Sequence, residues 1–183
     1  YFTGHGSKVK KDGKVYLTPH DFDLDHPEKT GWAVESLFQT IENNFQGERV
    51  LLMADCCYSG QLCVEAQKLN QSKIEYACLA SSTSGKESTG QWTFTESVIA
   101  GFSGNGEVDL DRDGAVELGE IVGYAENRMA RLEKQMTAFT ATDDFGVDLK
   151  LSRPAEKLDK RVGEFVKARS RGKWYGAKIV DSG

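Results

Sequence analysis

Two short motifs carry the residues of this chain that are best suited to covalent chemistry. His5 follows a short apolar start and precedes Gly6, and Cys57 follows the apolar run 50–54, 52 positions later. A cysteine thiolate is a strong nucleophile, and a neighbouring imidazole can take its proton and later protonate the leaving amine. The backbone N–H groups of Gly6 and Cys57 are the expected donors to an oxyanion. The two motifs therefore predict acyl transfer at a cysteine, with His5 and Cys57 as the catalytic pair.

Each of these residues ends a segment that is expected to be a β-strand. When two neighbouring strands run parallel, their carboxyl ends meet at one edge of the sheet, where open α/β sheets bind ligands. Side chains alternate between the two faces of a strand. Along 50–57 this alternation places Asp55 and Cys57 on one face and Cys56 on the other. We therefore expect Cys57 to be the nucleophile and Cys56 to be a buried core thiol.

Hydrophobic periodicity predicts the strands and helices that surround His5 and Cys57. Strands are expected at 1–5, 49–57, 74–81 and 137–142, an extended segment at 15–17, and helices at 33–45, 60–69, 95–102 and 118–133. Strands that alternate with helices are typical of α/β proteins. The sequence therefore predicts an α/β fold with a mostly parallel sheet flanked by helices.

The segments Thr3–Gly6 and Asp55–Gly60 resemble the metacaspases and their bacterial relatives, and the resemblance extends over residues 1–152. Animal caspases carry Gln-Ala-Cys where this chain has Asp-Cys-Cys. The resemblance implies a caspase-like cysteine endopeptidase whose specificity pocket is lined by Asp55 and Thr3. A carboxylate in that pocket favours a peptide or protein substrate that is cleaved after arginine or lysine.

The same resemblance implies two further features. Ser81 and Ser82, at the end of the strand 74–81, are expected beside the substrate groove, although a plain exposed linker explains them equally well. The family fold has a strand, a helix and a second strand before the histidine strand, whereas this sequence begins on the histidine strand. We therefore expect the chain to be part of a longer protein.

A further motif, separate from the histidine and cysteine motifs, is the acidic segment 109–120, which matches the twelve-residue EF-hand loop. The residues at its ligand positions are Asp109, Asp111, Asp113, Ala115 (through its carbonyl), Glu117 and Glu120. Carboxylates crowded at this density repel one another unless a cation is present. We therefore expect Ca²⁺ to bind here, and the alternative is an acidic turn that caps the next helix without a metal.

Charge and pattern change near the carboxyl end. Residues 153–183 carry nine basic and four acidic side chains, whereas the whole chain has 23 Lys+Arg and 28 Asp+Glu. We expect a linker at 153–160 and, at 161–183, a β-hairpin that resembles the start of a small Tudor- or SH3-like barrel. Its partner is expected to be a peptide or a nucleic acid, and Trp174 and Tyr175 are candidates for an aromatic cage.

The remaining composition narrows the function class. No apolar run is long enough to cross a membrane, and the four cysteines form no CxxC pair, which argues against a zinc site or a disulfide framework. Reduced thiols favour a cytoplasmic setting.

The alternative function is a catalytically impaired, calcium-binding interaction module on a caspase-like scaffold, but the retained His5, Asp55 and Cys57 favour the enzyme.

Overall fold

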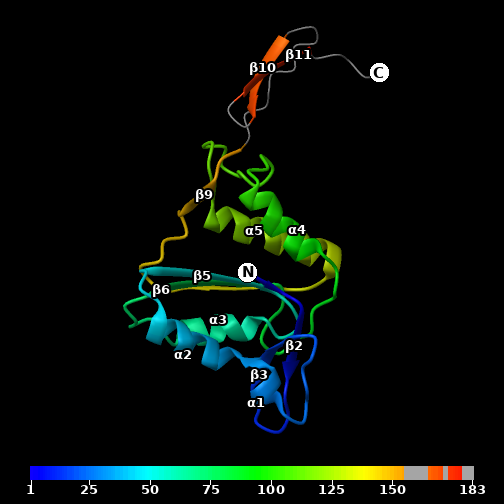
Figure 1. Ribbon diagram of the computed structural model, residues 1–183, viewed down its shortest axis with the longest axis vertical. Coiled ribbons are helices and arrows are strands. Elements are labelled where there is room, and N and C mark those ends of the chain that lie inside the picture. The colour runs from blue at the N-terminus through cyan, green and yellow to red at the C-terminus, as the bar shows by residue number, and fades with distance from the viewer. Residues whose placement is uncertain (155–164, 171–172, 179–183) are drawn as a thin grey trace.

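A computed structural model describes residues 1–154, 165–170 and 173–178 (Figure 1). Its main sheet has the strand order β1-β5-β6-β8. These strands are β1 (Phe2–Thr3), β5 (Arg49–Asp55), β6 (Glu75–Ala80) and β8 (Ala138–Ala141). β1 and β6 both run parallel to β5, and β8 runs antiparallel to β6. The α/β class is therefore as expected, and the sheet is mixed.

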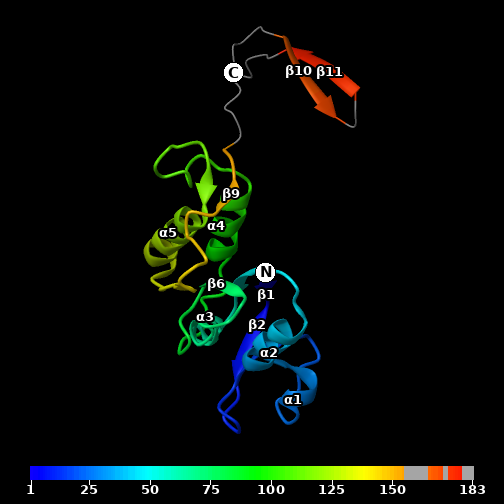
Figure 2. The same cartoon turned by 90° about the vertical axis from the view of Figure 1, so that its left-hand side faces the viewer.

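Two pairs of helices cover the two faces of this sheet (Figures 1 and 2). On one face lie α2 (Val34–Asn44) and α3 (Gly60–Gln67), and on the other α4 (Thr93–Phe102) and α5 (Leu118–Arg128). The side chains of β5 and of the residue after it alternate between the two faces of the sheet. Ala54 and Cys56 pack in the core against α2 and α3, and Met53 packs in the core against α4 and α5. The alternation expected from the sequence is thus confirmed at the strand that leads to Cys57.

The segment around His5 differs from the expectation. The predicted strand 1–5 is wrong beyond Thr3, because the chain leaves the main sheet at Gly4. It then forms a separate antiparallel sheet from β2 (His5–Lys8), β3 (Val15–Thr18) and β4 (Trp32–Ala33), with the short helix α1 (Pro27–Thr30) beside it. His5 therefore lies at the junction of two sheets.

The acidic segment connects α4 to α5 along the chain. Its last residues form β7 (Val116–Glu117), which pairs antiparallel with β9 (Lys150–Ser152). The helix expected at 118–133 is α5 followed by a π-helical turn, Met129–Glu133, which ends at Lys134 with a left-handed φ of 54°. The acidic loop is thus held between a helix on one side and a strand pairing on the other.

The expected carboxyl-terminal hairpin is present as two antiparallel strands, β10 (Phe165–Ser170) and β11 (Lys173–Lys178). The rest of the proposed barrel segment, most of the linker 153–160 and the side chains of Trp174 and Tyr175 lie outside the residues that the structure describes. Among the described helices, none has the length and apolar character needed to cross a membrane. All four cysteines are free.

Candidate functional site

The two motifs meet in one cavity at the carboxyl ends of β1 and β5. Its volume is about 370 Å³, and its lining includes Thr3, His5, Asp55 and Cys57. His5 is exposed and Cys57 is half-buried, so both are accessible from solvent. The expected catalytic pair and the expected pocket residues therefore share one cavity.

Close backbone contacts hold the two motifs together. Thr3 lies opposite Asp55 in the parallel pairing, and the Gly4 N–H donates to the Asp55 carbonyl at 3.3 Å. A Cβ added to Gly6 would lie only 2.0 Å from the Cys57 carbonyl oxygen. Gly6 is therefore required at this position because any side chain would push the histidine segment away from the cysteine turn.

The environment of Cys57 differs from that of its neighbour. The Ser88 N–H donates to the Cys57 Sγ at 3.3 Å. No acceptor for the Cys57 N–H is found within residues 1–154, which leaves that group available to an oxyanion. Cys56 is 2% exposed, and burial raises the pKa of its thiol to about 12. A buried thiol that stays protonated is a poor nucleophile, so the geometry favours Cys57 over Cys56.

Ser81 and Ser82 are not brought to the cavity. Both are fully buried. The Ser82 hydroxyl lies 3.1 Å from that of Ser59 and donates to the Cys56 carbonyl at 3.0 Å. Ser82 therefore braces the cysteine turn from the interior, whereas the buried Ser81 hydroxyl has no hydrogen-bond partner. The expected contact of their side chains with a substrate has no support in this placement.

Two polar residues that the sequence did not single out extend a line of hydrogen bonds from the pocket carboxylate: Thr95 contacts Asp55, and Tyr1 contacts Thr95. Thr95, in the first turn of α4, donates a hydrogen bond from its hydroxyl to the Asp55 Oδ2 at 2.6 Å. The Tyr1 hydroxyl lies 2.5 Å from the Thr95 Oγ1. Forty positions separate Thr95 from Asp55, so no local pattern could have revealed the contact.

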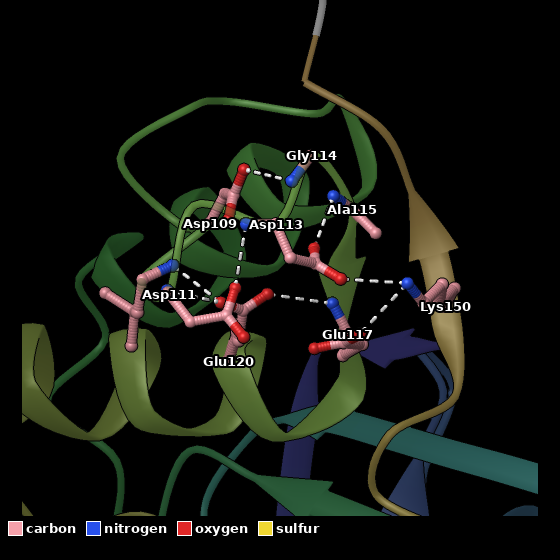
Figure 3. Close-up of polar contacts among 9 residues, drawn as sticks. Asp109, Asp111, Asp113, Gly114, Ala115, Glu117, Glu120 and Lys150 are labelled. Atoms are coloured by element: carbon pink, nitrogen blue, oxygen red, sulfur yellow. Dashed lines mark hydrogen bonds and ion pairs between the residues drawn. The ribbon is translucent and has the colours of Figure 1, made fainter.

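A second candidate site lies in the acidic loop, shown in Figure 3. One carboxylate oxygen each from Asp109, Asp111 and Glu120 lies within 4.8 Å of the others, a spacing that could hold a metal ion. Asp109 is only 9% exposed, and its Oδ1 is buried with no hydrogen-bond partner. A buried carboxylate oxygen without a partner is costly. The loop therefore offers an unsatisfied acceptor where a cation would bind.

The loop keeps its shape through hydrogen bonds to its own carboxylates (Figure 3). Glu120 accepts from the N–H groups of Leu110, at 2.6 Å, and Glu117, at 3.0 Å. Asp109 accepts from the Gly114 N–H at 3.2 Å, where the φ of 85° at this glycine makes the turn. The converging carboxylates are therefore oriented by the backbone that surrounds them.

Two of the other expected ligands, Asp113 and Glu117, lie outside this cluster of carboxylates. Lys150, on β9, lies 2.9 Å from the Asp113 carboxylate and 3.6 Å from that of Glu117 (Figure 3). The hydrogen bond from Lys150 lowers the pKa of Asp113. Ala115 is buried, and its N–H donates to Asp113 at 2.8 Å. Three of the six expected ligand residues thus converge, and two others pair with a lysine instead.

Comparison with known proteins adds no relative. A search of protein-family models found no matching family, and searches of curated proteins and of solved structures found no match.

Proposed function

We propose that this chain is a cysteine endopeptidase that hydrolyses the peptide bond after an arginine or a lysine. The observation that carries the proposal is the shared cavity of His5, Cys57 and Asp55. A nucleophile, a base and a pocket carboxylate in one cavity are the groups that this reaction needs. The residues come from two segments that Gly6 allows to pack closely.

In the proposed reaction, His5 accepts the proton of the Cys57 thiol, and the thiolate attacks the carbonyl carbon of the scissile bond. The N–H groups of Cys57 and Gly6 stabilise the negative charge that develops on the carbonyl oxygen. His5 then gives its proton to the leaving amine, which yields a thioester on Cys57. Water, deprotonated by His5, hydrolyses the thioester and frees the thiol.

Asp55 is the proposed determinant of specificity. It is 8% exposed and lines the same cavity as the nucleophile. A fixed carboxylate in a partly dry pocket attracts a guanidinium or an ammonium group and repels another carboxylate. A basic side chain on the acyl side of the scissile bond is therefore the expected substrate feature.

The test is hydrolysis of matched fluorogenic peptides that end in arginine, lysine or aspartate by the full chain. The proposal requires turnover of the arginine and lysine peptides, slow or no turnover of the aspartate peptide, and loss of all turnover in Cys57→Ala. Equal rates on the three peptides, or full activity in Cys57→Ala, would contradict it.

We further propose that the acidic loop binds Ca²⁺. The supporting observation is the buried, unpartnered Oδ1 of Asp109 beside the oxygens of Asp111 and Glu120. An all-oxygen set of carboxylates suits a hard cation, and Ca²⁺ accepts the flexible, many-ligand geometry that such a loop offers better than Mg²⁺ does. If the chain binds Ca²⁺ and hydrolyses no peptide, the second candidate function applies, a calcium-binding interaction module on an inactive scaffold.

Calorimetric titration of the full chain with CaCl₂, and separately with MgCl₂, tests this second proposal. One Ca²⁺ site that disappears in Asp109→Asn is the expected result. Absence of heat and of any thermal stabilisation at millimolar Ca²⁺ would leave the loop as an acidic turn.

A further inference from the structure

The pocket carboxylate is held at one of its two oxygens. Thr95 donates to the Asp55 Oδ2 at 2.6 Å. No donor to Oδ1 is found in the part of the chain that the structure describes, and this oxygen is not among the atoms sealed from solvent without a partner. Asp55 therefore presents a free oxygen at the cavity that it lines.

The direction of the hydrogen bonds follows from the chemistry of the three groups. An ionised carboxylate can only accept, so the single hydroxyl proton of Thr95 goes to Asp55. The Thr95 oxygen, 2.5 Å from the Tyr1 hydroxyl, must then accept the phenolic proton. Burial raises the pKa of Tyr1, which keeps its phenol protonated and able to donate. Tyr1, Thr95 and Asp55 thus form a directed chain of hydrogen bonds.

The helix that carries Thr95 holds its hydroxyl in place relative to the sheet. Thr95 lies in the first turn of α4, a ten-residue helix that packs on the face of the sheet opposite to α2 and α3. The positive end of the helix dipole also favours a carboxylate near this turn. The helix therefore delivers a donor to the end of β5 with little freedom to move.

We propose that Thr95, oriented by Tyr1, is a positioning residue for substrate specificity: it fixes the Asp55 carboxylate so that its free oxygen receives the cation of an arginine or lysine side chain. This inference rests on the proposed peptidase function. It assigns selectivity between charged and neutral side chains to a hydroxyl that does not itself line the cavity. Loss of the hydroxyl leaves the charge of Asp55 in place but lets the carboxylate turn away.

The test compares Thr95→Val, which is similar in size and lacks the hydroxyl, with Thr95→Ser, which retains it. The full chain and both variants hydrolyse two matched peptides, one ending in arginine and one in citrulline, its uncharged analogue. A hydrogen bond to a charged group predicts a loss of roughly tenfold or more in the arginine-over-citrulline ratio of kcat/KM for Thr95→Val. The loss should lie mainly in KM, and Thr95→Ser should restore the ratio to within about threefold.

Other outcomes separate this inference from the function on which it rests. An unchanged ratio in Thr95→Val, or an equal loss on both peptides, overturns the inference while the peptidase stands. If the unmutated chain cleaves neither peptide, the proposed function fails. Calorimetric binding of the same two peptides to Cys57→Ala, with and without Thr95→Val, then decides the positioning role: a Thr95-dependent preference for arginine supports it, and no preference overturns it.

Discussion

Replacement of Gly6 by alanine tests how closely the histidine and cysteine segments must approach. The new Cβ would lie 2.0 Å from the Cys57 carbonyl oxygen and 3.3 Å from the Cys56 Sγ, and such carbons essentially never approach another atom within 3.0 Å. The obstructing atom is backbone, so no side-chain rotation relieves the contact. The two segments must therefore separate by about 1 Å, a displacement that can cost about 100-fold in rate when it misplaces catalytic groups.

The same clash should also lower stability. Overpacking a close-packed site typically costs about 1–3 kcal/mol, and for a domain of this size each 1 kcal/mol lowers Tm by roughly 2–4 °C. The measurements are the Tm of Gly6→Ala and its kcat/KM on an arginine peptide. Gly106→Ala is the matched control, because a Cβ there meets no atom within 4 Å. If Gly6→Ala matches Gly106→Ala in both Tm and kcat/KM, the proposed packing of the two motifs is wrong.

Three further predictions address the nucleophile and the metal loop. Iodoacetamide at pH 8 should alkylate Cys57 and spare Cys56, because burial raises the pKa of Cys56 to about 12 and its thiol stays protonated at that pH. Tandem mass spectrometry of the labelled peptide distinguishes the two cysteines, and a label on Cys56 alone would reverse the assignment. Glu120→Gln should abolish Ca²⁺ binding in calorimetry, because Glu120 both joins the cluster and orients the loop through its hydrogen bonds. Retention of the affinity of the unmutated chain would exclude Glu120 as a ligand. Lys150→Met should raise Ca²⁺ affinity several-fold, because removal of the lysine frees the Asp113 carboxylate, 2.9 Å away, for the ion. Weaker binding in this variant would mean that Lys150 organises the loop and does not compete with the ion.

Local patterns in the sequence account for most of the elements that position the candidate site residues. The period of two along 50–57 correctly separated the two cores on which β5 packs and placed Cys56 in the interior, because alternation depends only on the extended backbone. Helical periodicity located α2, α3 and α4 to within a few residues, because the period of 3.6 residues depends only on the local helical backbone. The spacing of the acidic loop also brought Asp109, Asp111 and Glu120 together, because a turn of twelve residues closes locally.

Contacts between distant segments decided the rest. Thr95 meets Asp55 across 40 positions and Lys150 meets Asp113 across 37, and neither contact has a local signature in the sequence. Ser82 is of a residue type common in exposed loops, yet it is buried. Its hydroxyl donates to the Cys56 carbonyl and so satisfies a polar atom of the cysteine turn. Local sequence patterns were enough to select the candidate site residues and to assign them to strand faces. Only tertiary packing decided which of them share a cavity and which donors and cations surround them, because those contacts depend on how the two faces of the sheet are covered.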